Sequence, residues 1–374
     1  MDKKIIFPGD TLGVIGDSPN GIMLVEAAKK LGLTVIAYSN QEASPTLKAS
    51  DVKIVGELFD LGKLRDFGER CDVVVYESVQ VAADIIEYLS QYTYIPQNKE
   101  ALVIAQDRLL ERTFLEQLNI NIAPYATIVS LDDIYQTIGS IGYPCILKPI
   151  QKGFFKNRQR IIRKQTDIAK CSDIIEQGTY VLESLIPYSQ ELSIILSRDC
   201  LGNLKFFPIA QDVYREYHLH QVLVPSQISD PVETEIKRIA SQIATALEYV
   251  GVMQVSFYMT EQGNLYVKKF VPTLSQTGFV FDKATNISMF EQHLRTICNL
   301  PMATPKLLAA TAVVMLEKDK MEDIRTQWIL KDNWFYNFYR YPKSLQGRNM
   351  GYLLVTAPTI HAAKDQIEST GIWE

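Results

Sequence analysis

The sequence lacks several features that would assign it to a broad class at once. Its 374 residues contain no apolar run near the roughly 18 residues that a membrane-spanning helix needs. The opening segment MDKKIIFPGD has no long apolar stretch of the kind that directs secretion. The net charge of −5 provides no basic excess for releasing counterions from nucleic acid phosphates. We therefore expect a cytoplasmic protein, with neither nucleic acid nor a membrane as partner.

Cysteine and histidine are scarce as well. An odd set of single cysteines, without a Cys-x-x-Cys pair or a secretion signal, predicts reduced thiols in the core. The five are Cys71, Cys145, Cys171, Cys200 and Cys298. Among four histidines, His218 and His220 could share a strand face as metal ligands. Hydrogen-bonded or solvated histidines are the commoner outcome of such a pattern.

The composition is that of a globular protein with more than one core. Hydrophobic residues make up 47% and charged residues 22% of the chain, which is typical of soluble domains. A chain of this length exceeds what a single core usually supports, so we expect two or three domains.

The first segment has the pattern of a parallel α/β sheet. Residues 10–38 predict strand, helix and strand, and further strands are expected at 52–55 and 72–76, with helices near 61–68 and 81–91. Within the first turn, Gly13, Gly16 and Gly21 suit a phosphate-binding loop at a helix N-terminus. The set is not G-x-G-x-x-G, so a plain tight turn stays open as the alternative.

The order of elements changes after residue 100. One or two helices are expected over 100–118, and strands over 180–182 and 192–198. A hairpin of strands 251–259 and 264–270 follows a helix at 231–249, and another helix is expected at 288–297. Strands at 307–316 and 351–356 come last. We predict an α/β domain with a doubly wound parallel sheet over 1–100, an α+β domain over 101–300 and a small β-rich domain over 301–374.

The stretch YPCILKPIQKGFFKNRQ at 143–159 is the strongest local signal for a ligand site. An apolar strand ends in Lys148, whose compact cation can reach phosphate oxygens, and a loop follows that could cover them with backbone N–H groups. A loop this close to phosphate needs glycine. Only Gly153 is present, among bulky and cationic side chains. The pattern indicates an ATP site in which the residues expected to contact the phosphates are altered.

Motifs in order over about 250 residues carry a resemblance to a known family. They are 105–108 (AQDR), Glu111, Arg112, Phe114, Leu115, 123–125 (APY), 142–144 (GYP) with Lys148, 191–193 (ELS), 290–295 (FEQHLR), Leu300, Pro301, Gly347, Arg348, Met350 and Gly351. Together they resemble the ATP-grasp superfamily and, within it, the N5-carboxyaminoimidazole ribonucleotide synthetase family. The resemblance implies a pre-ATP-grasp domain, an ATP-grasp domain and a C-terminal domain. It also implies a homodimer, and carboxylation of aminoimidazole ribonucleotide with ATP and bicarbonate in purine biosynthesis.

The resemblance implies a set of nucleotide-binding positions. Arg108 and Lys148 match cationic contacts to ATP, the segment 183–186 matches the adenine hinge, and Glu191 matches an acid that accepts from ribose hydroxyls. The full set is Arg108, Lys148, Gly153, Gln159, Glu183, Ser184, Leu185, Ile186, Glu191, Lys268 and Lys269.

The metal and substrate positions depart from the family pattern. The resemblance implies one Mg²⁺-binding glutamate where Ser256 stands, and an asparagine followed by a second glutamate where the pair Lys268-Lys269 stands, so no metal ligand is assigned. Ammonium groups would repel the ion that offsets charge on the triphosphate. For the substrate, the implied contacts that remain are Gly16, Gly21, Glu77 and Arg348.

Polar groups at the implied reaction centre are replaced. The family's Ala-Pro-Arg-Pro-His-Asn-Ser-Gly-His stretch is VPTLSQTGF at 271–279, and no catalytic residue is assigned with assurance. Gln211-Asp212-Val213-Tyr214 replaces a Glu-Asn-x-His segment, and Val79, Tyr341 and Asn349 replace a glutamate and two lysines.

We therefore hypothesise a fold that is maintained while the family's reaction is lost or reduced. Losing a metal ligand or a charge-stabilising donor lowers a rate by ~10²–10³-fold each. One alternative is a non-catalytic nucleotide- or metabolite-binding homologue that acts as a regulator or partner subunit. Another is a ligase with a new substrate, whose phosphates Lys268 and Lys269 contact directly.

Overall fold

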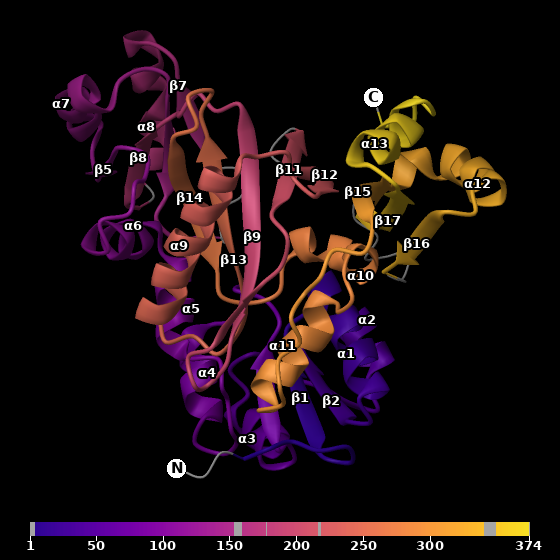
Figure 1. Ribbon diagram of the computed structural model, residues 1–374. Coiled ribbons are helices and arrows are strands. Elements are labelled where there is room, and N and C mark those ends of the chain that lie inside the picture. Colours follow the sequence, from indigo (N-terminus) through magenta and orange to yellow (C-terminus); the bar gives the residue numbers. More distant parts are fainter. Residues whose placement is uncertain (1–3, 153–158, 177, 216–217, 340–348, 374) are drawn as a thin grey trace. The chain divides into compact units, whose positions relative to one another are not determined.

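The computed structural model describes residues 4–152, 159–176, 178–215, 218–339 and 349–373 (Figure 1). Gly153 and Arg348 lie outside these residues. The chain divides into two compact units. The first unit comprises Met1–Lys99, Leu192–Gln254 and Val271–Glu374, and the second comprises Glu100–Glu191 and Val255–Phe270.

The first unit begins with the parallel sheet expected from the sequence. Its strand order is β3-β2-β1-β4, with β1 (Thr11–Ile15), β2 (Thr34–Ser39), β3 (Val52–Val55) and β4 (Val73–Tyr76). All of these pairings are parallel. The accompanying helices are α1 (Pro19–Lys30), α2 (Pro45–Ala49), α3 (Leu61–Glu69) and α4 (Ala83–Leu89). The predicted doubly wound domain is confirmed.

Gly16 in the turn before α1 and Gly21 within α1 both lie against neighbouring side chains. Ser18 caps the helix by accepting from the Asn20 N–H, and Pro19 occupies the first turn. Gly16 has φ +133°, and a Cβ on it would lie 2.3 Å from Glu77 Oε1. A Cβ on Gly21 would lie 2.4 Å from Thr46 Oγ1. Close packing within the unit accounts for both glycines, and phosphate binding by this turn stays a prediction.

A four-stranded antiparallel sheet organises the second unit. Its order is β5-β8-β6-β7, with β5 (Tyr125–Ile128), β6 (Cys145–Pro149), β7 (Arg160–Ile162) and β8 (Tyr180–Ser184). The helices are α5 (Lys99–Gln106), α6 (Arg108–Gln117), α7 (Leu131–Ile141), the 3₁₀ helix η1 (Gln165–Cys171) and α8 (Ser172–Ile175). A core that includes Ile134, Leu147 and Leu182 lies on one face. Lys148 stands near the end of β6, as predicted.

The largest sheet has the order β14-β13-β9-β11-β12-β15-β17-β16, with β10 beside β9. Its strands are β9 (Gln190–Arg198), β10 (Leu204–Phe206), β11 (Ala210–Arg215), β12 (His218–Val224), β13 (Gly251–Met259), β14 (Leu265–Val271), β15 (Ala310–Glu317), β16 (Trp334–Phe338) and β17 (Asn349–Ala357). The predicted hairpin is confirmed as β13 and β14. The C-terminal strands extend the sheet because β15 pairs antiparallel with β12.

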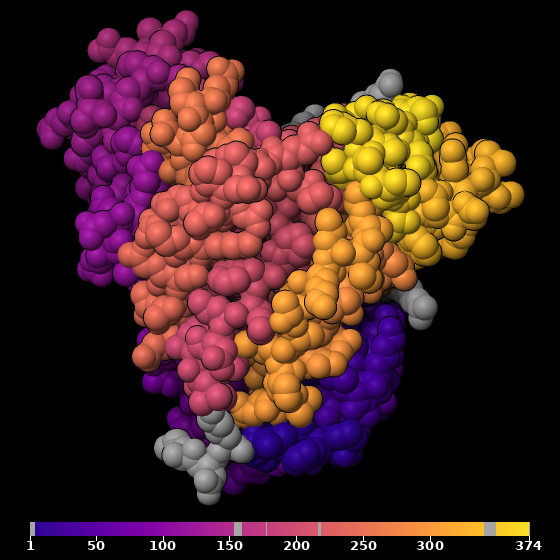
Figure 2. Space-filling view, in the orientation of Figure 1, coloured from indigo at the N-terminus to yellow at the C-terminus, as the bar shows by residue number. Residues whose placement is uncertain are grey.

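The remaining helices of the first unit cover this sheet. They are α9 (Asp230–Ala246), η2 (Gln276–Val280), α10 (Phe281–Ala284), α11 (Met289–Ile297), η3 (Lys318–Lys320), α12 (Met321–Leu330) and α13 (Ile360–Glu368). Figure 2 shows the C-terminal residues in yellow at the surface. In this part of the chain, Ile360 and Ile367 of α13 share a core with Leu353 of β17. A separate core joins Val14, Phe207 and Phe281 from the three segments of the unit.

Two expectations about side chains need comment. Four of the five cysteines are buried free thiols, but Cys200 is exposed, because it lies in the turn between β9 and β10. The expectation of a core thiol is wrong for that residue. His218 and His220 both lie on β12. Across the described ranges, no group of three or more His, Cys, Asp or Glu side chains is arranged to hold a metal ion. In those ranges, no helix has the length and apolarity to cross a membrane.

His293 is a buried titratable group in the first unit. It lies on α11, and its Nδ1 accepts a hydrogen bond of 3.1 Å from the backbone N–H of Val252. Burial lowers the pKa of His293 to about 3, so the side chain is neutral in the folded protein. In an unfolded chain the pKa of histidine is about 6.5. The stabilising contribution of the neutral ring is therefore complete above that value and is lost progressively as the pH falls toward 3.

We expect the free energy of unfolding to fall with acidification more steeply in the wild type than in His293→Asn. The asparagine oxygen can replace Nδ1 as acceptor but does not titrate. Between pH 6.5 and 5.5 the difference should be about 1 kcal/mol, measured by urea unfolding at each pH. Equal pH dependence in the two proteins would show that His293 titrates normally.

Candidate functional site

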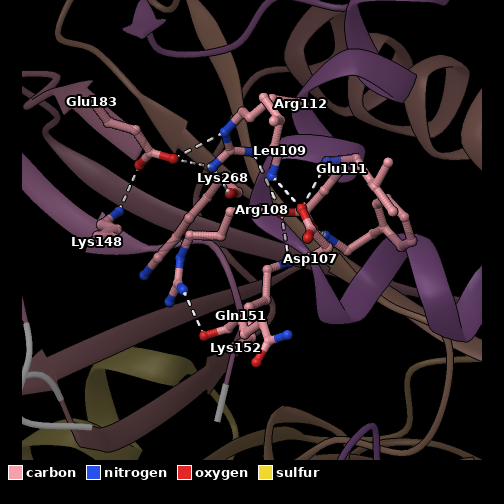
Figure 3. A network of polar contacts seen from close by, with 12 residues as sticks. Asp107, Arg108, Leu109, Glu111, Arg112, Lys148, Gln151, Lys152, Glu183 and Lys268 are labelled. Atoms are coloured by element: carbon pink, nitrogen blue, oxygen red, sulfur yellow. Dashed lines mark hydrogen bonds and ion pairs between the residues drawn. The ribbon is translucent and has the colours of Figure 1, made fainter. Parts of the chain in front are cut away.

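Eight charged side chains of the second unit form a connected group, here called the charged cluster (Figure 3). Its members are Arg108, Glu111, Arg112, Lys148, Lys152, Glu183, Glu191 and Lys268. They come from α6, β6, β8, β9, β14 and the segment that follows β6. The cluster therefore depends on several elements of the unit being folded at once.

Helix α6 supplies three members because of where it begins. Asp107 caps it, accepting from the N–H groups of Leu109 and Leu110 at 2.8 and 3.0 Å. This start places Glu111 and Arg112 on the buried face of the helix beside Leu115. Charged residues are rarely buried without partners, so both need compensation from neighbouring elements.

Glu183 provides that compensation at the end of β8. Its carboxylate lies 2.6 Å from Lys148 Nζ and 3.0 Å from the guanidinium of Arg112, and only 3% of the residue is exposed. Burial alone would raise the pKa of Glu183, but Lys148 and Arg112 together lower it to about 2. The glutamate is thus ionised, and it binds α6, β6 and β8 together.

Glu111 is a second buried carboxylate that pairs with cations, and Arg112 is one of them. Glu111 lies 2.6 Å from Lys152 Nζ and accepts a hydrogen bond of 3.1 Å from the Phe270 N–H. Burial lowers the pKa of Lys152 to about 8, although Glu111 acts in the opposite direction. Arg112 also donates to the Lys268 carbonyl at 2.9 Å. These bonds attach β14 to α6.

Arg108 is held by backbone groups instead of a carboxylate. Its guanidinium donates to the carbonyl oxygens of Pro149 and Gln151. The backbone N–H of Arg108 donates to the carbonyl oxygen of Ile150 at 2.7 Å. Burial lowers the pKa of Arg108, and the charge of Arg112 acts in the same direction. Figure 3 shows Arg108 lying between α6 and the segment after β6. This arrangement aligns cations along that segment.

Lys268 of β14 lies at the edge of the cluster. Its ammonium is 2.6 Å from Glu191 Oε2 and 5.2 Å from the ring centre of Tyr258, a cation–π contact. Tyr258 stacks on Tyr188 at 4.7 Å. The cluster thus holds five cations and three carboxylates, and Asp107 acts electrostatically on Arg108 as a fourth negative charge. The remaining positive excess is suited to a polyanion such as a polyphosphate.

Comparisons with known proteins show which families and structures the chain is similar to. The ATP-grasp domain family matches residues 113–290, and the ribonucleotide synthetase preATP-grasp domain family matches residues 10–106. N5-carboxyaminoimidazole ribonucleotide synthase of Bacillus subtilis (strain 168) is 28% identical over 354 residues, covering 94% of this chain and 93% of that protein. A solved N5-carboxyaminoimidazole ribonucleotide synthetase in complex with ADP has a TM-score of 0.94 at 27% identity, covering 99% and 98% of the two chains.

The chain belongs to the N5-carboxyaminoimidazole ribonucleotide synthetase family. The structure of the Staphylococcus aureus N5-carboxyaminoimidazole synthetase complexed with ADP has the same fold, with a TM-score of 0.93 at 23% identity and 98% of each chain covered. The resemblance seen in the motifs is confirmed.

The second unit holds most positions that the family resemblance implied for nucleotide. Arg108, Lys148, Glu183, Glu191 and Lys268 lie in the charged cluster. The other described positions are Gln159, Ser184, Leu185, Ile186 and Lys269. Gly153 lies outside the described residues. The segment after β8 is fixed by backbone bonds, from Ser184 N–H to Pro124 O at 2.9 Å and from Leu185 N–H to Pro144 O at 3.1 Å.

The implied substrate positions lie in the first unit. Glu77 is buried and accepts from both the backbone N–H and the hydroxyl of Ser18, beside Gly16. Burial raises the pKa of Glu77 to about 7. Gly21 lies within α1 against Thr46. Arg348 lies outside the described residues.

The segment that replaces the family's polar stretch is packed into the first unit. Phe279 is fully buried and stacks on Tyr352, with ring centres 4.3 Å apart. Thr277 donates to Asp212 at 3.2 Å and accepts from Gln254 at 3.3 Å. Leu274 is buried as well. These side chains are used in packing.

Several members of the cluster were not among the site residues assigned from sequence. They are Glu111, Arg112 and Lys152. The signal was present for two of them: Glu111 and Arg112 fall in the apolar stripe of α6, where an unpaired charge would be costly. For Lys152 the sequence offers no comparable signal, because its partner Glu111 is remote in the chain.

We expect Glu183→Gln to weaken the second unit by about 3–5 kcal/mol, because it leaves Lys148 and Arg112 buried without a carboxylate. Hydrogen–deuterium exchange of the β6 and β8 amides would measure this loss. Glu176→Gln makes the same change at an exposed position of the same unit and should have little effect. Equal exchange in both variants would contradict the assigned role of Glu183.

Proposed function

We propose that this protein is a nucleotide-binding member of its family in which ATP- and bicarbonate-dependent carboxylation of aminoimidazole ribonucleotide is strongly reduced. Support for nucleotide binding comes from the relative solved with ADP and from the cationic excess of the charged cluster. The proposed contacts are Arg108, Lys148, Gly153, Gln159, residues 183–186, Glu191, Lys268 and Lys269. The proposed remnants of the substrate site are Gly16, Gly21, Glu77 and Arg348.

The proposal includes the organisation inferred from the sequence. It comprises a pre-ATP-grasp domain over 1–100, an ATP-grasp domain over 101–300 and a C-terminal domain over 301–374. A homodimer is part of the proposal, by analogy with the family. The matches at residues 10–106 and 113–290 support the first two domains.

The observation that carries the reduced activity is the ion pair between Lys268 and Glu191. In the family pattern, glutamates near this point of the hairpin hold Mg²⁺. Here an ammonium lies 2.6 Å from Glu191 Oε2, and the donor set offers positive charge where the ion requires oxygen ligands. Ser256 contributes at most a neutral hydroxyl. The residues present do not fit Mg²⁺, and we assign no reaction step to it.

The packing of 271–279 supports the same proposal independently. Substrate contacts require polar side chains exposed to the ligand, but Phe279 and Leu274 are buried among apolar neighbours. The hydroxyl of Thr277 is hydrogen-bonded to Asp212 and Gln254. The chain's own groups therefore take up hydrogen bonds that a substrate would use.

A non-catalytic role as regulator or partner subunit is the second candidate. The observation in its favour is that the buried carboxylate of Glu183 is paired with both Lys148 and Arg112. Such a network maintains a binding site even where turnover is not required.

The test is carboxylation of aminoimidazole ribonucleotide with ATP, bicarbonate and Mg²⁺. We expect a rate at least ~10²-fold below that of the Bacillus subtilis relative under identical conditions, since more than one charge-stabilising group is replaced. Stabilisation by ATP, measured as a thermal shift, tests binding separately and should reach about 2.7 kcal/mol at a hundred times the dissociation constant.

A rate equal to that of the relative would refute the loss of activity. Absence of any shift with ATP or ADP would refute the nucleotide-binding part. The double variant Ser256→Glu/Lys269→Glu should increase the rate if the missing carboxylates are the cause.

A further inference from the structure

The charged cluster already contains the charge that a metal ion would bring to a triphosphate. Mg²⁺ in ATP-using enzymes offsets negative charge on the β and γ phosphates. In this cluster, cations outnumber carboxylates by five to three. Lys148 and Arg108 interact electrostatically and repel one another. An added anion would relieve that repulsion.

Lys268 is the member best placed to substitute for the metal. It lies on β14, the second strand of the hairpin, and Arg112 fixes its backbone through the carbonyl oxygen. Its ammonium is positioned by Glu191 and by the face of Tyr258. An ammonium group can donate three hydrogen bonds, so the pair with Glu191 is compatible with a further acceptor such as a phosphate oxygen.

Adjacent residues of a strand point to opposite faces. Lys268 and Lys269 therefore face opposite sides of β14, and only Lys268 is assigned this role.

We infer that the phosphates of a bound nucleotide are neutralised by protein cations, Lys268 foremost, and that the metal-free nucleotide is the form this protein binds. The inference rests on the nucleotide binding proposed above and specifies its chemistry. Mg²⁺ would reduce the negative charge of the ligand and add a cation beside Lys268. Both effects weaken attraction to a cluster of positive charge. Magnesium is thus a competitor for the nucleotide and not a cofactor.

Isothermal titration of ATP into the full chain, once with EDTA and once with excess Mg²⁺, tests this directly. We expect a lower dissociation constant in EDTA than in Mg²⁺. Lys268→Met should raise the constant in EDTA by about tenfold or more, because a charge-assisted hydrogen bond to phosphate is lost. Lys268→Glu should raise it further in EDTA and regain affinity when Mg²⁺ is added, since a carboxylate can bind the ion.

Lys170→Glu is the matched control. It makes the same charge change in the same unit, at an exposed side chain paired with Asp167 and outside the cluster. Its dissociation constants should equal those of the wild type in both buffers. Circular dichroism of each variant verifies folding before titration.

The outcomes separate the two proposals. Binding that is as tight or tighter with Mg²⁺ would overturn the metal-free inference and leave nucleotide binding intact. Absence of binding in both buffers would overturn the nucleotide-binding part of the proposed function as well. If Lys268→Met and Lys268→Glu behaved like Lys170→Glu, the role of Lys268 would be refuted whatever the effect of Mg²⁺.

Discussion

The ionised carboxylate of Glu183, buried between Lys148 and Arg112, is the interaction on which the site depends. A buried carboxylate is costly unless cations and hydrogen bonds compensate it, and here α6 and β6 each supply one cation. Arg112 then extends the arrangement through Glu111 and the Lys268 carbonyl. Arg112 thus links the Glu183 pairs to Glu111 and to β14.

The proposed loss of turnover is compatible with this dependence. Glu183, Lys148 and Arg112 contribute to the fold of the second unit, so their loss would destabilise the protein itself. In the proposal, the positions that the family uses for metal carry no such constraint. A lysine at 268 is accommodated by Glu191 and Tyr258, and it supplies positive charge without requiring oxygen ligands. In the first unit, Phe279 is likewise accommodated, because its ring stacks on Tyr352.

Most of the architecture could be predicted from the sequence because its signals are local. Helix α1 has its cap and its proline, β6 has an apolar run before Lys148, and the hairpin has its turn residues. The family followed from ordered motifs. The sequence alone does not predict the strands β5, β10, β11 and β16 or the helices α2, α7, α8, α10, α12 and α13. Several of these are short, and their stability comes from pairing that sequence alone does not display.

The pairing of charges was harder to predict than their presence. Glu111 with Lys152 and Lys268 with Glu191 join residues far apart in the chain. Nothing in the local sequence of Lys268 indicates that it would contact the acid aligned with ribose binding. Such partners are decided by the tertiary structure, as is the burial of Thr277 and Phe279.

The central claim is that protein cations have taken the place of magnesium. Crystals grown with ATP and MnCl₂, examined by anomalous scattering at the manganese edge, test it most directly. The account predicts nucleotide density near Lys148 and Lys268 with no anomalous peak beside the β13–β14 hairpin. Two well-ordered manganese ions coordinated there would contradict it.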